Sequence, residues 1–131
     1  MKNKTSLTLF DDERYKLNFQ NFPPEHTITE LNQVHGNDII DGENSFNETI
    51  SADGFIFPIS SEKNFAIKTA DCICLFYEGV NFCALVHAGW RGIQKNIHLS
   101  EKIQNIGPKI IILSPSICPQ CYEVSDDFVK E

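Results

Sequence analysis

The chain has 131 residues, of which 41% are hydrophobic and 22% are charged, and its formal net charge is −7 at pH 7. A chain of this length buries enough surface to fold as one domain without a disulfide or a structural metal. The acidic balance argues against a nucleic acid or an anionic membrane as partner, because clustered lysines and arginines bind such surfaces. We therefore expect a single domain over residues 1–131, in which any metal serves chemistry.

The sequence also indicates where the protein resides. Its amino-terminal segment reaches acidic residues before any apolar stretch long enough for a secretory signal, and no run approaches a transmembrane span. Five cysteines are an odd number, and disulfides persist mainly in oxidising compartments. We expect a reduced, cytoplasmic protein. Its four histidines are too few for a multicopper cluster, so we expect at most one modest metal site.

Short alternating or apolar segments predict strands over residues 5–10, 27–31, 55–57, 65–67, 73–77 and 82–86. After the last of these, isoleucines at 93, 97, 103 and 106 fall near one face of a helix, which Gly107 and Pro108 would stop. A second apolar run follows at 110–113. This order predicts an α/β fold with a βαβ unit over residues 82–113, whose two strands run parallel with a right-handed crossover.

The last residues predict the beginning of another helix. Ser125 is a good N-cap, and Asp126 and Asp127 suit the positive end of a helix dipole. Only four residues follow, and a helix of one turn does not stabilise itself. We expect either a packed stub or a chain shorter than the fold to which it belongs.

The turn after residue 86 has the sequence His-Ala-Gly-Trp-Arg-Gly at positions 87–92. Glycines allow a tight turn, a helix N-terminus offers unpaired N–H groups, and an arginine adds a fork suited to phosphate or carboxylate. These features predict an anion site at Gly89, Arg91 and Gly92. The alternative is an ordinary glycine-rich turn with Trp90 packed on the core and Arg91 solvated.

Three metal-ligand types occur at His35, Cys72 and His87. Two imidazoles and one thiolate suit Zn²⁺ and leave a fourth position open for water, as in catalytic zinc sites. The alternative makes His35 a turn histidine and Cys72 a small buried hydrophobic residue.

The thiols allow two further assemblies. Cys72 and Cys74 lie two residues apart on a predicted strand, so with Cys118 and Cys121 they offer a four-sulfur zinc site. A redox role for Cys118 and Cys121 is a weaker alternative, because the pair does not open a clear helix.

A metal-free reaction is also open at the same residues. Cys72 would attack a carbonyl, His87 would act as the base and an acid such as Asp71 would orient it. A cysteine–histidine hydrolase and a cysteine–histidine metal site need the same residue types, so the sequence alone does not separate them.

Five motifs occur in one order along residues 31–124: Gln33-Val34-His35-Gly36, Ala52-Asp53-Gly54, Thr69-Ala70-Asp71-Cys72, the segment at 87–92, and Pro115-Ser116-Ile117 followed by Tyr122-Glu123-Val124. With these motifs the chain resembles the YfiH or laccase-domain family, once labelled polyphenol oxidases and now associated with purine nucleoside phosphorylase activity. The resemblance implies an α/β (α+β) fold of layered sheets with flanking helices.

The resemblance further implies a Zn²⁺ ion, with copper less expected, held by catalytic residues at His35, Cys72 and His87. A purine nucleoside would bind beside it, and inorganic phosphate would cleave adenosine, inosine or methylthioadenosine to the free base and ribose 1-phosphate. Some adenosine deamination is implied as well. The predicted anion site suits the attacking phosphate, and an open-position zinc suits deamination.

The chain departs from the family pattern at its ends. Residues 1–30 show no counterpart of the family's asparagine-arginine helix, and the family's further cysteines and arginine-rich end are absent after Glu131. We therefore expect a domain abbreviated at the N-terminus that ends early at the C-terminus. The alternative function is a weakly active relative that binds metal or nucleoside, or needs a partner chain, with self-association as a homo-oligomer.

Overall fold

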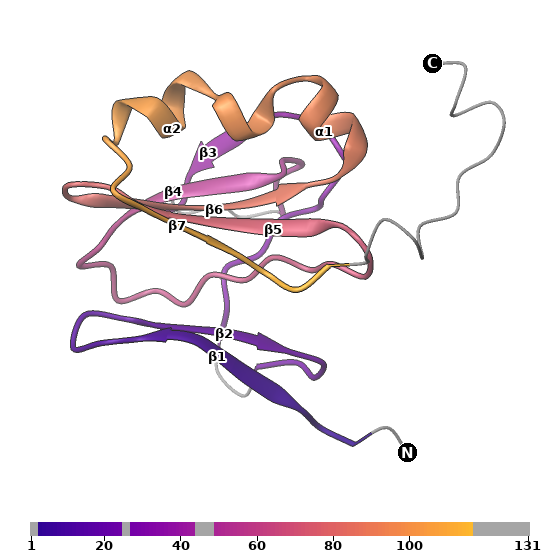
Figure 1. Ribbon diagram of the computed structural model, residues 1–131, viewed down its shortest axis with the longest axis vertical. Coiled ribbons are helices and arrows are strands. Elements are labelled where there is room, and N and C mark those ends of the chain that lie inside the picture. Colours follow the sequence, from indigo (N-terminus) through magenta and orange to yellow (C-terminus); the bar gives the residue numbers. More distant parts are fainter. Residues whose placement is uncertain (1–2, 25–26, 44–48, 117–131) are drawn as a thin grey trace, which may run out of the picture.

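The computed structural model describes residues 3–24, 27–43 and 49–116, which form two β-sheets and a short helical layer (Figure 1). The elements in chain order are β1 (Ser6–Asp11), β2 (Lys16–Gln20), β3 (Ile39–Asp41), β4 (Gly54–Pro58), β5 (Ile73–Glu78), β6 (Phe82–Ala88), α1 (Trp90–Gln94), the 3-10 helix η1 (Ile97–Leu99), α2 (Glu101–Asn105) and β7 (Ile110–Leu113). This mixed arrangement of layered sheets with flanking helices confirms the predicted fold class. Within the described ranges, no helix has the length and apolar character needed to cross a bilayer.

The larger sheet has the strand order β3-β4-β6-β5-β7. Strand β3 is parallel to β4, and every other neighbouring pair is antiparallel. Because β6 and β7 are both antiparallel to β5, they run in the same direction, as the βαβ prediction requires. Strand β5 lies between them, so the unit spans three strands and its two parallel strands do not pair with each other.

The predicted single helix after β6 is wrong, because the segment breaks into α1, η1 and α2. Asn96 adopts a left-handed conformation with φ 63°, which interrupts the helical path after α1. Ser100 then begins α2 afresh, and its hydroxyl accepts a hydrogen bond from the N–H of Lys102. As a result Ile93 is 43% exposed, whereas Ile97, Ile103 and Ile106 are buried. Gly107, with φ 63°, ends the segment at the predicted place.

Two predicted strands are also wrong. Segments 27–31 and 65–67 form only an isolated bridge, between Thr29 and Phe65. Phe65 is held by its ring, which stacks on Phe57 with centroids 4.1 Å apart, and not by a strand ladder. Conversely, β2 and β3 were not predicted. The helix predicted at Ser125, like Cys118 and Cys121, lies outside the described residues.

Side chains alternate across the larger sheet and build a core on each face. The cluster beneath the helices contains Ile39, Leu75, Tyr77, Ala84, Val86, Ala88, Ile97, Ile103 and Ile106. The cluster on the opposite face is built around Leu31, Ala52 and Phe55. The sheet therefore has two covered faces along β4, β5 and β6, and the candidate site lies where β6 ends and where β4 and β5 begin.

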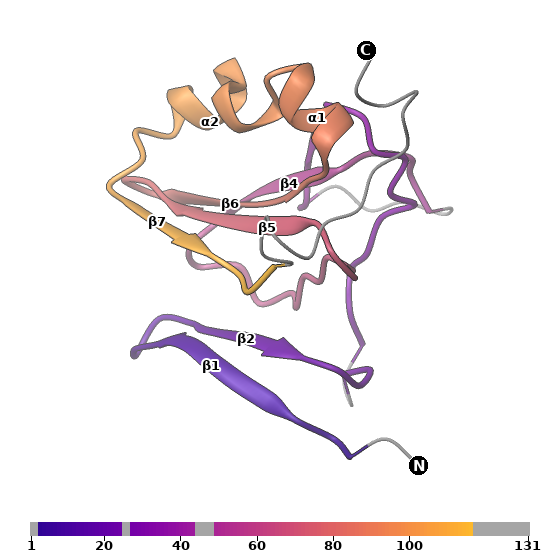
Figure 2. The same cartoon turned by 45° about the vertical axis from the view of Figure 1, so that its right-hand side comes forward.

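The β1–β2 hairpin forms a separate layer on the side of the sheet opposite the helices (Figures 1 and 2). Its turn is anchored to Glu78, a carboxylate at the end of β5 that is only 6% exposed. Glu78 accepts a hydrogen bond from the Tyr15 hydroxyl at 2.7 Å and forms an ion pair with Arg14. Burial, reinforced by the hydrogen bond and the negative charge of Glu78, raises the pKa of Tyr15. The Tyr15 ring also lies 5.2 Å from that of Phe76.

We expect Glu78→Ala to lower the free energy of unfolding by about 1–3 kcal/mol, because it leaves the Tyr15 hydroxyl without its acceptor. Urea denaturation measures this change. Glu62→Ala removes an exposed glutamate and serves as the control, with an expected change within about 0.5 kcal/mol. Equal stability of the two variants would show that the hairpin does not depend on this anchor.

Candidate metal centre

Strand β6 ends where its neighbours β4 and β5 begin, and this arrangement brings two of the predicted ligands together. In the antiparallel register Ile73 pairs with Ala88, so Cys72, just before β5, lies beside the end of β6. His87 is the last but one residue of β6. On the other side of β6, the N–H of His87 donates to the carbonyl of Asp53, just before β4, at 2.7 Å. Strand pairing alone therefore places Cys72, His87 and Asp53 next to one another.

The third predicted ligand, His35, lies on a loop that Asp53 holds through hydrogen bonds. The carboxylate of Asp53 accepts hydrogen bonds from the N–H groups of Val34, His35 and Gly36 at 3.0–3.1 Å. His35 has φ 59°, a left-handed conformation that costs free energy for a residue with a side chain. The three hydrogen bonds offset that cost and fix the direction in which the His35 side chain leaves the loop.

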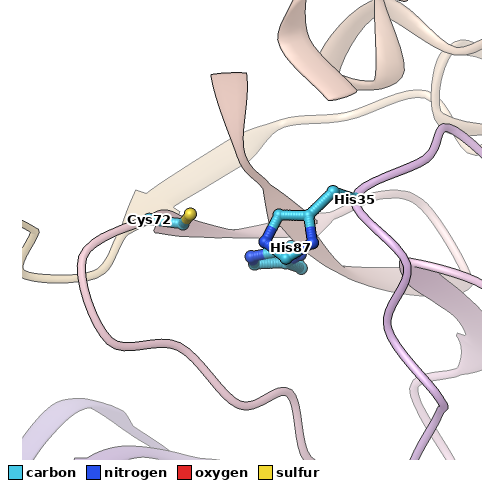
Figure 3. A group of neighbouring side chains, drawn as sticks. All are labelled: His35, Cys72 and His87. Atoms are coloured by element: carbon cyan, nitrogen blue, oxygen red, sulfur yellow. The ribbon is translucent and has the colours of Figure 1, made fainter. Parts of the chain in front are cut away.

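The donor atoms of His35, Cys72 and His87 all lie within 4.8 Å of one another. Figure 3 shows the three side chains gathered from three separate segments, and the two imidazole rings meet edge to face with centroids 5.0 Å apart. His35 is exposed, Cys72 is half-buried and His87 is 3% exposed. The structure thus brings together all three residues that the sequence analysis selected as ligands.

Asp53 also orients His87, since its Oδ2 lies 2.7 Å from Nδ1 of the ring. A proton held on Nδ1 leaves the lone pair of Nε2 free to bind a metal, which is the usual arrangement of a metal-binding histidine. Asp53 has no exposed surface. Burial raises the pKa of this carboxyl, but hydrogen bonds from His87, Gly36 and Val34 outweigh burial and the net pKa is lowered.

Sequence reasoning missed the role of Asp53 and, for the metal-free reaction, suggested an acid such as Asp71 to orient His87. Asp71 is exposed, and the acid that contacts the ring is Asp53. A signal was present, because Asp53 stands in the motif Ala52-Asp53-Gly54 directly before a predicted apolar strand. A carboxylate at such a strand end is buried only if several donors surround it.

The donor set and the space around it fit a metal ion. Tetrahedral zinc, with bonds of about 2.0–2.3 Å, places its donors roughly 3.3–3.7 Å apart, so modest side-chain shifts complete the site. Gly89 leaves room there. A Cβ at this position would lie 3.1 Å from His35 Cδ2, 3.4 Å from Cys72 Sγ and 3.7 Å from His87 Cε1. A side chain on Gly89 would therefore press on the His35 ring and fill the space beside the other two predicted ligands.

The thiol of Cys72 is better suited to bind a metal than to act as a nucleophile without one. Burial raises its pKa, and the negative charges of Asp71 and Asp53 raise it further. A nucleophilic cysteine needs a lowered pKa, whereas a bound divalent cation supplies the positive charge that a thiolate requires. The four-sulfur alternative depends on Cys118 and Cys121, which the structure does not describe.

The predicted anion site divides into groups with different environments. Gly89 is the N-cap of α1, and Arg91 is exposed, with its guanidinium carbon 4.4 Å from the centre of the Trp90 ring. Gly92 is buried, and a Cβ there would lie 2.9 Å from the carbonyl oxygen of Gly36. Gly92 therefore has a packing role against the His35 loop, and phosphate binding at Gly89, Arg91 and Gly92 stays a prediction.

Comparison with known proteins places the chain among relatives of the same fold. The sequence model of a family described as multi-copper polyphenol oxidoreductase laccase matches residues 11–131. Among solved structures, a Neisseria meningitidis protein of family DUF152 superposes with a TM-score of 0.64 at 26% identity, covering 79% of this chain and 44% of that one. YlmD from Geobacillus stearothermophilus gives 0.56 at 27% identity, with 78% and 45% covered.

Curated relatives carry the name purine nucleoside phosphorylase. The protein from Rickettsia conorii is 35% identical over 108 residues, which are 76% of this chain and 44% of the relative. The protein from Borreliella burgdorferi is 32% identical over 124 residues, which are 87% of this chain and 53% of the relative. The chain thus spans about half the length of these relatives.

We expect Asp53→Asn to lower the free energy of unfolding by about 2–4 kcal/mol, because a neutral amide cannot accept from all four donors that surround the buried carboxylate. Asp38→Asn is the matched control, since it makes the same chemical change at an exposed residue of a neighbouring loop. Urea denaturation of both variants provides the measurement. A loss no larger than that of the control would contradict a central role for Asp53.

Proposed function

We propose that this chain, which belongs to the family described as multi-copper polyphenol oxidoreductase laccase, takes part in the zinc-dependent phosphorolysis of purine nucleosides. The observation that carries the proposal is the convergence of His35, Cys72 and His87 on one point, with Asp53 behind His87. The name purine nucleoside phosphorylase, given to relatives about twice as long, supports the substrate class.

Zinc is the metal that we propose for this site. One thiolate and two imidazoles with an open fourth position are a typical donor set for catalytic zinc, and copper is less favoured. The four histidines of this chain do not provide the imidazoles of a multicopper cluster. When bound, zinc supplies a Lewis acid that polarises oxygen and activates water, which would also permit deamination of adenosine.

The residues of the chain have separate tasks in the proposed reaction. Asp53 keeps the proton on Nδ1 of His87, so that the lone pair of Nε2 stays available to the metal. His35 is exposed whereas His87 is buried, so the nucleoside would approach from the His35 side. Arg91 would hold phosphate through paired hydrogen bonds, together with backbone N–H groups near Gly89.

Phosphorolysis itself forms a bond from a phosphate oxygen to C1′ of the ribose and breaks the glycosidic bond to the purine. The purine nitrogen leaves with the bonding electrons and takes up a proton, and the products are the free base and ribose 1-phosphate. The protein's contribution is to position the two reactants and to stabilise the charge that develops on the leaving base.

Zinc binding is tested with two cysteine variants. We expect one zinc per chain in the wild type, measured by elemental analysis after equilibration with a competing chelator. Cys72→Ala should lose more affinity than the roughly 10–100-fold typical of changes behind a ligand. Cys74→Ala, two residues away on β5, should keep the wild-type zinc content. Equal loss in both variants, or no zinc in the wild type, would overturn the metal assignment.

Phosphorolysis is tested by the release of free base from adenosine or inosine in the presence of phosphate. We expect Arg91→Ala to reduce kcat/KM for phosphate about 10–100-fold, the value of a lost charge-assisted contact. Lys95→Ala is the control, because it removes an exposed cation from the next turn of the same segment. Zinc-loaded protein that releases no base would contradict the enzymatic proposal and favour a relative that binds metal or nucleoside without turnover.

A further inference from the structure

We propose that Gln33 is a positioning residue that fixes the separation between the His35 loop and the Cys72 segment, and thereby sets the metal affinity of the site. The proposal rests on the metal centre of the proposed function. It assigns to Gln33 a task that does not involve contact with the metal or the substrate.

The evidence is a double hydrogen bond between the Gln33 side chain and the backbone of Lys68. The side-chain Nε2 donates to the carbonyl oxygen of Lys68 at 2.6 Å, and the N–H of Lys68 donates to Oε1 of Gln33 at 2.7 Å. The amide group thus satisfies both main-chain polar groups of Lys68, as a neighbouring strand would. Because the partner is backbone, the contact constrains the path of the chain.

This contact lies close in sequence to two of the proposed ligands. Gln33 is two residues before His35, and Lys68 is four residues before Cys72. Between Lys68 and Cys72 the turn is closed by the Thr69 hydroxyl, which donates to the carbonyl of Cys72 at 2.5 Å. A shift of Lys68 would therefore be passed on to the backbone of Cys72.

Asp53 ties the His35 loop to His87 but leaves the Cys72 segment to other contacts. Cys72 itself lies just outside the β5 ladder, which begins at Ile73. The bridge between Thr29 and Phe65 joins the same two segments, but Thr29 is six residues from His35. The Gln33 amide is thus much closer along the chain to the histidine that must meet the Cys72 thiolate.

A third contact between the segments is an ion pair of Lys68 with Glu30 at 3.2 Å. Its side chains are 77% and 41% exposed, and exposed pairs of this kind contribute little. The two contacts of Lys68 can be separated by mutation, because its backbone binds Gln33 and its side chain forms the ion pair. Lys68→Ala therefore removes the ion pair and leaves the amide contact in place.

The test is a titration with Co²⁺, whose thiolate-to-metal charge-transfer absorption reports coordination by Cys72, followed by zinc competition with a chelator. Gln33→Met keeps the length of the side chain and removes both hydrogen bonds. We expect it to lower zinc affinity about tenfold and to weaken the charge-transfer band. Lys68→Ala should stay within about twofold of the wild type. Gln104→Met, which removes one exposed amide hydrogen bond on α2, is the control for fold stability.

The outcomes separate this proposal from the one on which it rests. No charge-transfer band in the wild type would overturn the metal centre itself. If the wild type shows the band, and Gln33→Met shows the same band and the same zinc affinity, the positioning role alone is overturned. Thermal denaturation of the metal-free proteins should give Gln33→Met and Gln104→Met similar midpoints. A selective loss of affinity at similar midpoints supports the role, and a parallel loss of midpoint and affinity in Gln33→Met alone contradicts it.

Discussion

The carboxylate of Asp53 is the group on which the site depends. It is fully buried, yet it accepts four hydrogen bonds, three from the His35 loop and one from His87. Isolated burial of a carboxylate is costly, so such a group persists only where donors surround it. One side chain thereby holds the loop of His35 and orients the ring of His87, a proposed ligand, so both the local fold and the proposed chemistry depend on it.

Around this carboxylate, the sheet and the loops make different contributions. The antiparallel pairing of β4 and β5 with β6 places Asp53, Cys72 and His87 side by side at one end of these strands by register alone. The His35 loop is held by hydrogen bonds to distant segments, because its N–H groups donate to the Asp53 carboxylate and its Gln33 side chain pairs with the backbone of Lys68. The site therefore combines a rigid half built on strands with a half that polar contacts hold in place.

The same division explains how much the sequence predicted. Apolar runs located β4, β5, β6 and β7, because burial on a sheet leaves a clear pattern. The three proposed ligands were selected by residue type and family resemblance, and the structure brings their donor atoms within 4.8 Å of one another. Asp53 was missed because the motif Ala52-Asp53-Gly54 shows only its place before a strand, whereas its role depends on backbone N–H groups and a histidine that lie far from it in the sequence. The single helix failed for a comparable reason, since the left-handed turn at Asn96 overrides the spacing of the isoleucines.

The contrast between the two histidines has a kinetic consequence. His87 is buried and tied to Asp53, whereas His35 is exposed on a loop that protein groups alone already order. The entropy of ordering that loop is thus part of folding, and an incoming ion does not have to provide it. Exchange of an ion would begin at the solvent-facing imidazole, with His87 as the last ligand to release it. The domain would then lose and regain its ion without unfolding, in contrast to small zinc modules whose fold depends on the ion.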